Sequence, residues 1–474
     1  MPIPRDNIPT ILVAFGATGD LMRRKVIPAL YHLHQHDQLP DKFRVIGFSR
    51  REYTDKMFHT FITEVLATRY GTSISKKSLA SFLRRFHFQR GDFDEAERYA
   101  SLKETFDELD KTWGVCSNKL FYFSVAPEFY ETIFKHLSKS RLSEPCDPGG
   151  GWTRVMVEKP FGMDTKTAKK LEKLLEKYFE EEQIYRIDHY LAKEMLQNIL
   201  TFRFANNLFE LNWGRELIER IDIRLLEDLG VEKRGPFYDA VGALRDVGQN
   251  HFLQMLALIT MEHPKSFDAR IIQERRADAL EKLRKIRLKE TFRAQYKGYR
   301  AIEGVAPRSK TETFFKIKAE LDTPKWRGVP IYMEGGKRMG RIQKEIVITL
   351  KHPAPCLCPP GSSHHKNLII IRLEPKEEIL IEFWSKRPGF SFATEPKMFH
   401  FLFRENSARM QYVEEYARLL LDCIRGDQTF FVSTREVKAM WRYTDPIIAG
   451  WEKNKVPLLF YKPDTTDILR RVKS

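Results

Sequence analysis

The N-terminal part of the chain alternates short apolar runs with stretches of helical periodicity. A continuous apolar run stands at residues 11–15, and further mainly apolar runs that end in turn residues stand at 43–49, 119–127 and 153–162. Apolar runs without polar alternation indicate strands that are buried on both faces. Strands that alternate with helices predict an α/β fold with a doubly wound parallel sheet, which binds ligands beyond the carboxyl ends of its strands.

The pattern changes in the second half of the chain. Three segments have the alternation of antiparallel strands, at residues 344–351, 367–375 and 377–386. The basic stretch 264–300 predicts charged helices and connections. We therefore predict a Rossmann-type dinucleotide-binding domain over residues 8–188. A larger α+β domain, built on a mainly antiparallel sheet, is expected over residues 189–474, with the active site where the domains join.

Composition and length place the chain among ordinary globular proteins. It has 474 residues, of which 42% are hydrophobic and 12% are aromatic. No apolar run approaches the roughly 20 residues that cross a bilayer, and the N-terminal apolar stretch is too short for a signal peptide. Five scattered cysteines are poor material for a disulfide framework and are typical of a reducing compartment. A cytoplasmic protein without a membrane partner is expected.

The charge balance favours anionic partners. The formal net charge is +16 at pH 7, which favours binding of phosphorylated metabolites, nucleotides or nucleic acid. The alternative is a charge balance adapted to the interior of the host cell. Cys356 and Cys358, with His364 and His365, stand in a Pro-rich loop. Since Cys-x-Cys is not the usual zinc spacing, we expect no metal site.

The first strand runs into a glycine-containing turn and then a helix. In "ILVAFGATGDLMRRKVIPAL", Gly16, Thr18 and Gly19 stand where backbone amides could approach a pyrophosphate. The spacing departs from G-x-G-x-x-G, so a tight turn in any doubly wound sheet is the alternative. The second strand ends in Ser49 and Arg50, and arginine there accommodates the 2′-phosphate of NADP. NADP is favoured as the cofactor, with NAD left open by Glu52.

The segment "RIDHYLAKEM" predicts a helix start with His189 and Lys193 one turn apart. Two cations in a first helical turn repel one another and oppose the helix dipole. A phosphate gripped by His189, Tyr190 and Lys193 would resolve both problems. The alternatives are glutamates from elsewhere in the fold, or a solvated helix face.

A second helix, from Asp239, carries polar residues among apolar ones. Buried polar groups without partners cost about 1 to 3 kcal/mol each, so these groups pair with one another or line a cleft. They are Asp246, Gln249, Asn250, His251 and Gln254. If Asp188 met His251, the carboxylate would orient the imidazole as a general base toward a substrate hydroxyl. With a nicotinamide nearby, that arrangement oxidises an alcohol.

Four motifs in this order resemble the glucose-6-phosphate dehydrogenase family: "GATGDL", "EKPFG", "RIDHYLAKE" and "RDVGQNHFLQM". The likeness continues through "NLIIIRLEPKEEI" to "YARLLLDCIRGDQTFFV" and spans nearly the whole chain. The resemblance implies oxidation of D-glucose 6-phosphate to 6-phospho-D-glucono-1,5-lactone, with hydride transfer to NADP and without a metal. This reaction is the first step of the oxidative pentose phosphate pathway.

The resemblance also implies roles for single residues. His251 is the base, oriented by Asp188. The substrate-binding positions are Lys159, His189, Tyr190, Lys193, Glu227, Asp246 and Lys337. Of these, Lys159 lies between substrate and cofactor. The cofactor-binding positions are Gly16, Thr18, Gly19, Arg50 and Lys159. A homodimer through the antiparallel sheet is expected by the same analogy.

Several positions depart from the family pattern. Met22 replaces an alanine of the coenzyme turn, and Ala192 replaces a glycine that a helix does not need. A second basic residue is expected five positions after Lys337, but Ile342 stands there, preceded by Arg341. Sugar preference or affinity can therefore differ. The alternative hypotheses are a dehydrogenase of another hexose phosphate and a nucleotide- or RNA-binding protein without dehydrogenase activity.

Overall fold

The polypeptide divides into two units, each built around its own sheet. In the computed structural model, unit 1 comprises Met1–Gly162, Lys166–Ala192 and Tyr412–Thr434, and unit 2 comprises Met163–Thr165, Lys193–Gln411 and Arg435–Ser474. The described residues are 9–71, 74–145, 150–355, 365–391, 393–402 and 414–472. Unit 1 thus takes in a C-terminal segment that the sequence boundaries assign to the second domain.

That segment belongs to unit 1 because helix α12 shares its core. Helix α12, Glu415–Arg425, has a strongly one-sided distribution of apolar residues and packs against helix α1, Ile27–Gln35. Leu419 and Leu420 are buried in the same hydrophobic cluster as Leu30. Sequence order alone does not show this return, because the apolar face of α12 would fit either unit.

Unit 1 contains the predicted parallel sheet. The strands are β1 Thr10–Phe15, β2 Phe43–Ser49, β3 Phe86–Arg90, β4 Asn118–Phe123, β5 Thr153–Val157 and β6 Ile184–Arg186. Over the described residues their order is β3-β2-β1-β4-β5-β6, and the neighbouring strands are parallel. This is the strand order of a doubly wound dinucleotide-binding sheet, which confirms the predicted fold class.

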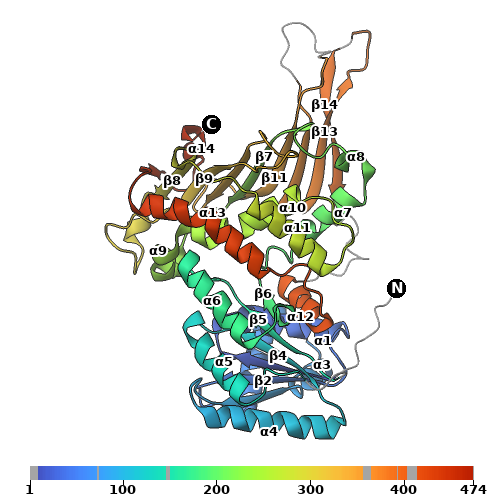
Figure 1. Cartoon of the computed structure of the whole chain (residues 1–474), viewed down its shortest axis with the longest axis vertical. Coiled ribbons are helices and arrows are strands. Elements are labelled where there is room, and N and C mark those ends of the chain that lie inside the picture. Colours follow the sequence, from blue (N-terminus) through green and yellow to red (C-terminus); the bar gives the residue numbers. More distant parts are fainter. Residues whose placement is uncertain are drawn as a thin grey trace. The chain divides into compact units, whose positions relative to one another are not determined.

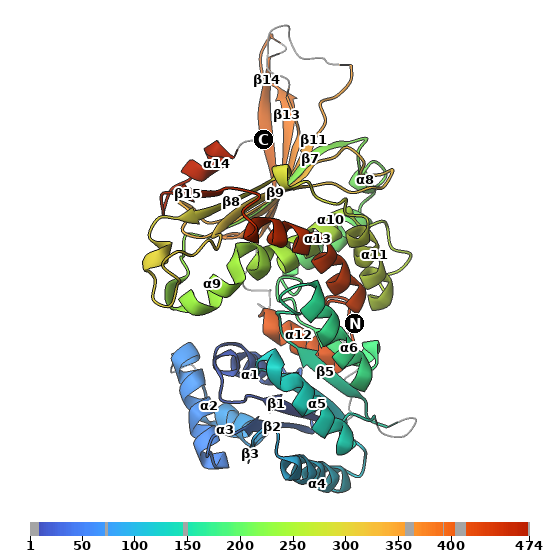
Figure 2. The same cartoon turned by 60° about the vertical axis from the view of Figure 1, so that its left-hand side comes forward.

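Helices cover both faces of this sheet (Figure 2). They are α1, α2 Asp55–Tyr70, α3 Lys76–Leu83, α4 Ala96–Trp113, α5 Tyr130–Lys139, α6 Thr165–Tyr178 and α12. Alternate residues of each strand serve opposite faces. Leu12 and Tyr122 lie in the cluster with α1 and α12, whereas Phe123 contacts Phe134 of α5 with ring centroids 5.0 Å apart. The sheet is therefore buried on both sides, as its apolar strands predict.

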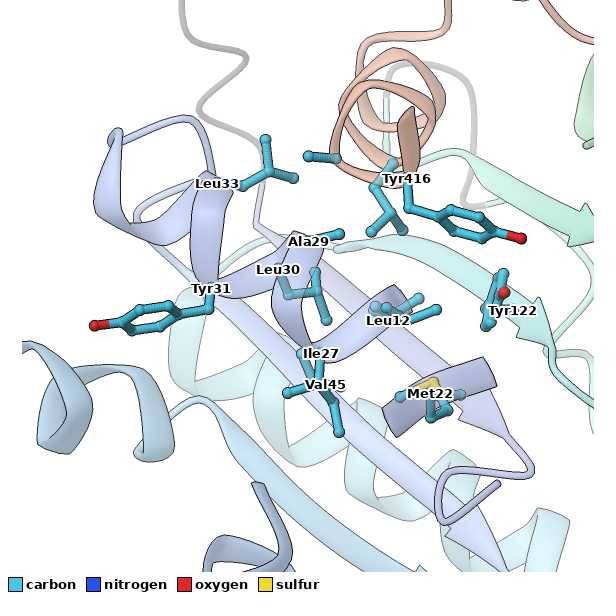
Figure 3. Close-up of a cluster of buried hydrophobic side chains, with 14 of the residues drawn as sticks. Leu12, Met22, Ile27, Ala29, Leu30, Tyr31, Leu33, Val45, Tyr122 and Tyr416 are labelled. Atoms are coloured by element: carbon cyan, nitrogen blue, oxygen red, sulfur yellow. The ribbon is translucent and has the colours of Figure 1, made fainter. Parts of the chain in front are cut away.

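Met22 is part of that core. It lies in a short π-helical turn, Met22–Val26, between the glycine turn and α1, and its side chain is fully buried. Figure 3 shows the Met22 side chain in the same cluster as Leu12 and Ile27. The larger residue is thus accommodated in the core by packing.

Unit 2 is built on a mixed, mainly antiparallel sheet (Figure 1). The strands are β7 Ile218–Leu226, β8 Thr291–Tyr296, β9 Phe314–Ala319, β10 Ile331–Gly336, β11 Gln343–Leu350, β12 Leu368–Glu374, β13 Glu378–Lys386, β14 Thr394–Leu402 and β15 Leu458–Tyr461. Over the described residues their order is β14-β13-β12-β11-β7-β10-β9-β8-β15, with β10–β7 and β15–β8 parallel. The three strands predicted between residues 344 and 386 are confirmed as β11, β12 and β13.

The basic stretch 264–300 is only partly helical. Helix α11, Ala269–Glu281, is followed by strand β8, which the expectation of helices and connections missed. Five of the six β8 residues are buried, although Arg293 and Gln295 are polar. Arg293 donates to the carbonyl of Val456, 3.0 Å away, so a buried polar side chain finds its partner in the tertiary structure. The charged residues of this stretch therefore gave no indication of β8, a strand paired on both sides in the sheet.

Most helices of unit 2 lie along one side of its sheet, whereas α14, Asp467–Arg471, lies apart from them beside β15 (Figures 1 and 2). The others are α7 Glu194–Phe204, α8 Asn207–Glu210, α9 Gly235–Ala243, α10 Leu253–Thr260, α11 and α13 Thr434–Glu452. A π-helical segment, Leu244–Phe252, joins α9 to α10. The helix predicted from Asp239 is therefore interrupted. Gly242 has a φ of +71°, and a Cβ there would lie 2.6 Å from the buried carboxylate of Glu312.

A buried ion pair fixes α13 to α11. Arg276 Nε lies 2.8 Å from Glu436 Oε1, and both side chains are fully buried. We expect Glu436→Ala to lower the free energy of unfolding by about 3 to 5 kcal/mol, because it leaves a buried guanidinium without its charge partner. Thermal unfolding should show a clear loss. Glu281→Ala removes an exposed partner of Arg435, and we expect a change below about 1 kcal/mol. Equal effects of the two variants would contradict this.

The cysteines give one correction. Cys116 is disulfide-bonded, against the expectation that the scattered cysteines are reduced, and Cys423 is a buried free thiol. Sequence spacing does not reveal which cysteines meet in space. Cys356, Cys358 and His364 lie outside the described residues. Among the helices within the described ranges, none is long and apolar enough to span a membrane.

Candidate active site

The turn after β1 requires glycine at its first position. Gly16 has a φ of +80°, and a Cβ there would lie 2.4 Å from the carbonyl oxygen of Ser124. The Gly16 amide donates to the carbonyl of Phe48, and the Gly19 amide donates to the carbonyl of Gly16, each at 2.9 Å. The turn is thus held against the carboxyl ends of β2 and β4. Such a close backbone approach is typical of a pyrophosphate cradle.

The end of β2 presents a cation beside this turn. The hydroxyls of Thr18 and Ser49 lie 3.3 Å apart and are buried, which ties the turn to the tip of β2. Arg50 follows directly and is exposed. The nearest acidic residue in the sequence, Glu52, pairs with Arg90 at 2.9 Å. A basic group rather than a carboxylate is therefore offered where the adenosine ribose of a dinucleotide lies.

A partly buried carboxylate stands beside Lys159 at the end of β5. Glu158 accepts hydrogen bonds from Tyr122 at 2.7 Å and from Tyr416 at 3.3 Å. Burial raises the pKa of the Glu158 carboxyl to about 7, against the lowering effect of the two tyrosines and of Lys159. Lys159 itself is half-buried. It follows Glu158 directly after β5, and no sequence pattern singles out Glu158.

The segment after β6 is a turn and not the predicted first turn of a helix. Helix α7 begins at Glu194, and Lys193 precedes it in extended conformation. Asp188 is buried, and its Oδ1 accepts the backbone amide of Tyr190 at 3.0 Å. Such a local bond from an aspartate competes with helix formation, which explains the later helix start. His189 and Lys193 therefore do not share a helical face.

In unit 2, two predicted substrate-binding residues directly follow neighbouring parallel strands. Glu227 follows β7 and Lys337 follows β10, and these strands are parallel with Gly336 opposite Leu226. The Glu227 amide donates to the carbonyl of Gly336 at 2.9 Å. The Lys337 ammonium forms an ion pair with the Glu227 carboxylate. An adjacent donor and acceptor of this kind suit the hydroxyl groups of a sugar.

Two further residues join that pair, and the sequence reasoning missed both. Glu374, at the end of β12, lies 3.1 Å from Nζ of Lys193 and 2.6 Å from Nζ of Lys344. Burial alone would raise the pKa of the Glu374 carboxyl, but the hydrogen bond and charge of Lys344, with the charge of Lys193, lower it below its ordinary value. The pairing of Lys344 with Glu374 follows from the strand register, which the sequence pattern does not show. Lys344 and Glu374 lie opposite one another in the antiparallel register of β11 and β12.

His251 lies in the π-helical segment between α9 and α10. Its side chain is 1% exposed, and its backbone amide donates to Oδ1 of Asn250 at 2.7 Å. Nδ2 of Asn250 donates to the carbonyls of Arg245 at 3.3 Å and of Asp246 at 3.1 Å. The asparagine thus satisfies backbone groups that the wide helical turn displaces. π-helical turns of this kind occur frequently at functional sites.

The predicted residues are divided between the two units. In unit 1 they follow the carboxyl ends of strands β1, β2, β5 and β6, and they are Gly16, Thr18, Gly19, Arg50, Lys159, Asp188, His189 and Tyr190. In unit 2, Lys193 connects with Glu227 and Lys337 through the ion pairs of Lys344. Asp246 and His251 share one helical segment. Each unit therefore carries part of the predicted machinery.

Comparison with known families covers both units. A family profile described as "Glucose-6-phosphate dehydrogenase, NAD binding domain" matches residues 13–198. One described as "Glucose-6-phosphate dehydrogenase, C-terminal domain" matches residues 200–468. The chain is 37% identical over 470 residues to glucose-6-phosphate 1-dehydrogenase of Chlamydia pneumoniae, over 96% of this chain and 92% of that protein. It is 38% identical over 452 residues to the enzyme of Aggregatibacter actinomycetemcomitans, over 92% and 90% of the two chains.

Solved structures give the same picture. A structure described as "Glucose-6-phosphate dehydrogenase in complex with its substrate glucose-6-phosphate" has a TM-score of 0.90 at 29% identity, over 97% of this chain and 96% of that chain. Glucose-6-phosphate 1-dehydrogenase from Mycobacterium avium has a TM-score of 0.83 at 30% identity, over 96% and 94% of the two chains.

Proposed function

This chain belongs to the glucose-6-phosphate dehydrogenase family, and we propose that it oxidises D-glucose 6-phosphate with NADP as hydride acceptor and His251 as base. The product is 6-phospho-D-glucono-1,5-lactone. The observation that carries the assignment of chemistry is the buried His251 in a π-helical turn of a chain with a dinucleotide-binding sheet. General base and hydride acceptor are the two parts that alcohol oxidation requires.

The proposed reaction moves one proton and one hydride. The His251 imidazole takes the proton of the C1 hydroxyl, and the electron pair of that O–H bond forms the carbonyl of the lactone. The C1 hydrogen leaves as hydride with the electron pair of its C–H bond, which a bound oxidised nicotinamide would accept. Asp188 orients the imidazole and stabilises its protonated form. After turnover, His251 releases the proton that it took from the C1 hydroxyl to water.

The remaining predicted residues bind the two substrates. We assign the phosphate to His189, Tyr190 and Lys193, whose donors suit an anion. The sugar hydroxyls are assigned to Glu227, Asp246 and Lys337. Support comes from the ion pair of Glu227 with Lys337, which offers both hydrogen-bond polarities. Lys159, at the end of β5, is placed between substrate and cofactor.

Two observations support dinucleotide binding at the predicted cofactor site. The close backbone approach at Gly16 leaves no room for a side chain, and the turn with Thr18 and Gly19 lies at the carboxyl end of β1. When bound, NADP supplies the hydride acceptor. Arg50 is assigned to the 2′-phosphate, because it is exposed at the tip of β2 while Glu52 is paired with Arg90.

The assignment of Arg50 gives a cofactor prediction. We expect Arg50→Ala to raise KM for NADP by about tenfold or more, since it removes a charge-assisted contact with the 2′-phosphate. KM for NAD, which lacks that phosphate, should change less than about threefold. Steady-state kinetics with both cofactors measure this. Lys56→Ala is the control, because Lys56 is an exposed cation of α2 in the same unit. A loss that is equal for NADP and NAD would contradict the assignment.

A panel of sugar phosphates tests the proposed substrate. The purified chain should oxidise glucose 6-phosphate with a higher kcat/KM than mannose 6-phosphate, galactose 6-phosphate or glucosamine 6-phosphate. A higher value for another hexose phosphate would make that sugar the substrate of the same machinery. Salt-sensitive RNA binding together with no dehydrogenase activity on any of them would favour the nucleotide- or RNA-binding alternative.

A homodimer and a cytoplasmic location complete the proposal. Strands β13 and β14 leave apolar side chains exposed, including Phe383, Phe399 and Phe401. With helix α7 they line a groove of about 720 Å³. Exposed apolar surface of this kind supports a self-association interface. Sedimentation of the purified chain measures the oligomeric state, and a monomer at micromolar concentration would contradict the dimer.

A further inference from the structure

A chain of ion pairs extends the phosphate end of the proposed substrate site in unit 2. Glu374 bridges Lys193 and Lys344, with N···O distances of 3.1 and 2.6 Å. Lys344 also lies 3.5 Å from Glu227, which pairs with Lys337. Three ammonium groups and two carboxylates therefore alternate, and the cluster retains one positive charge. The Glu374 carboxylate lies between the ammonium groups of Lys193 and Lys344, where an anion of higher charge could also bind.

The backbone fixes Lys344 in this cluster. Lys344 lies opposite Leu225 of β7 on one side and opposite Glu374 of β12 on the other. Its side chain is mostly buried, whereas Ile342 is 44% exposed and Arg341 is exposed. The cation that strand β11 brings to the cluster is thus Lys344, two residues beyond the isoleucine.

We propose that Lys344 is a second phosphate-binding lysine beside Lys193, and that Glu374 holds the two ammonium groups until the substrate phosphate replaces it. The inference rests on the proposed function, which assigns Lys193 to the phosphate. A phosphate dianion carries more charge and more acceptor oxygens than a carboxylate, so both lysines gain by the exchange. The Glu374 side chain is 34% exposed and can be solvated when it is displaced.

The roles of Lys344 and Glu374 have opposite consequences for phosphate binding. Without Lys344 the phosphate loses a charge-assisted contact, and binding weakens. Without the charge of Glu374 the two lysines lose an internal competitor, and binding tightens. If the ion pairs only stabilised the fold, the two substitutions would not change phosphate affinity in opposite directions, and their effects would not depend on the phosphate group of the substrate.

The first test compares Lys344→Ala with Arg341→Ala. We expect Lys344→Ala to raise KM for glucose 6-phosphate about tenfold or more, with kcat changed less than about threefold. Its kcat/KM for unphosphorylated glucose should stay within about threefold of the wild type, since no phosphate is involved. Arg341→Ala should leave both substrates unchanged, and Lys344→Arg should recover most of the lost affinity. Equal KM values for Lys344→Ala and Arg341→Ala would overturn the inference.

The second test uses inorganic phosphate and does not depend on turnover. Phosphate should raise the unfolding temperature of the wild type, raise it less for Lys344→Ala, and raise it more for Glu374→Gln, since a ligand that binds only the folded state stabilises it. As a competitive inhibitor, phosphate should have a several-fold lower inhibition constant with Glu374→Gln. An unchanged or weaker response of Glu374→Gln would overturn the role of Glu374. If the wild-type chain bound phosphate through Lys344 but oxidised no sugar phosphate, the proposed function would be overturned and the phosphate-binding role of Lys344 would stand.

Discussion

Replacing His251 with asparagine is expected to lower kcat by about four powers of ten or more while substrate affinity is retained. The side chain is 1% exposed within the π-helical segment, and in the proposed mechanism its removal takes away the base that accepts the proton of the C1 hydroxyl. Asparagine is close in size and keeps a polar group at the buried position, which limits the structural disturbance. Calorimetric titration with glucose 6-phosphate, together with steady-state rates, separates binding from chemistry.

A second histidine of unit 2 provides the matched control. His263 is exposed, and its Nδ1 lies 2.7 Å from the carbonyl oxygen of Pro264, outside the helical segment. His263→Asn should leave kcat within about threefold of the wild type. If His251→Asn turned over at a near-normal rate with an unchanged unfolding temperature, another group would have to be the base.

Replacing Asp188 with asparagine is expected to lower kcat by about two to four powers of ten. The amide oxygen can still accept the backbone amide of Tyr190, so the turn after β6 should persist. What is lost is the negative charge that stabilises the protonated base in the proposed mechanism. The acid limb of the kcat/KM profile should therefore move to lower pH, because an imidazole without a neighbouring carboxylate gives up its proton more readily.

Asp427 offers a control with the same local geometry. Its Oδ1 accepts the amide of Thr429, two residues on, at 2.9 Å, just as Asp188 accepts that of Tyr190. Asp427→Asn should leave kcat and the pH profile unchanged within about threefold. A loss of activity in Asp188→Asn without any movement of the acid limb would mean that Asp188 acts through the structure of the turn, and not through its charge.

Four strands of the N-terminal sheet, β1, β2, β4 and β5, could be predicted from the sequence because they are short apolar runs, whereas the polar residues of β3 and the shortness of β6 left those two strands unpredicted. Such runs are typical of parallel strands covered on both faces, and β1 and β2 lie within one residue of their predicted bounds. The glycine turn was also predictable, since its position between a strand and a helix restricts what it can do. Roles of single residues, in contrast, rested on a resemblance.

Features set by tertiary contacts could not be predicted. The helix expected at His189 gives way to a turn, because Asp188 bonds to the backbone of Tyr190. The kink at Gly242 depends on Glu312, which is far away in the sequence. Strand β8 lies within a charged stretch, because its buried polar side chains find partners only in the folded unit. Lys344 and Glu374 were missed since their pairing depends on strand register.

The central claim is that this chain transfers hydride from glucose 6-phosphate to NADP. The most direct measurement is the absorbance of reduced nicotinamide when the purified chain receives glucose 6-phosphate with NADP or with NAD in parallel. We expect a steady rise with NADP, a slower rise with NAD, and no rise for His251→Asn. No rise in the wild type with either cofactor, at saturating substrate and with the chain folded, would contradict it.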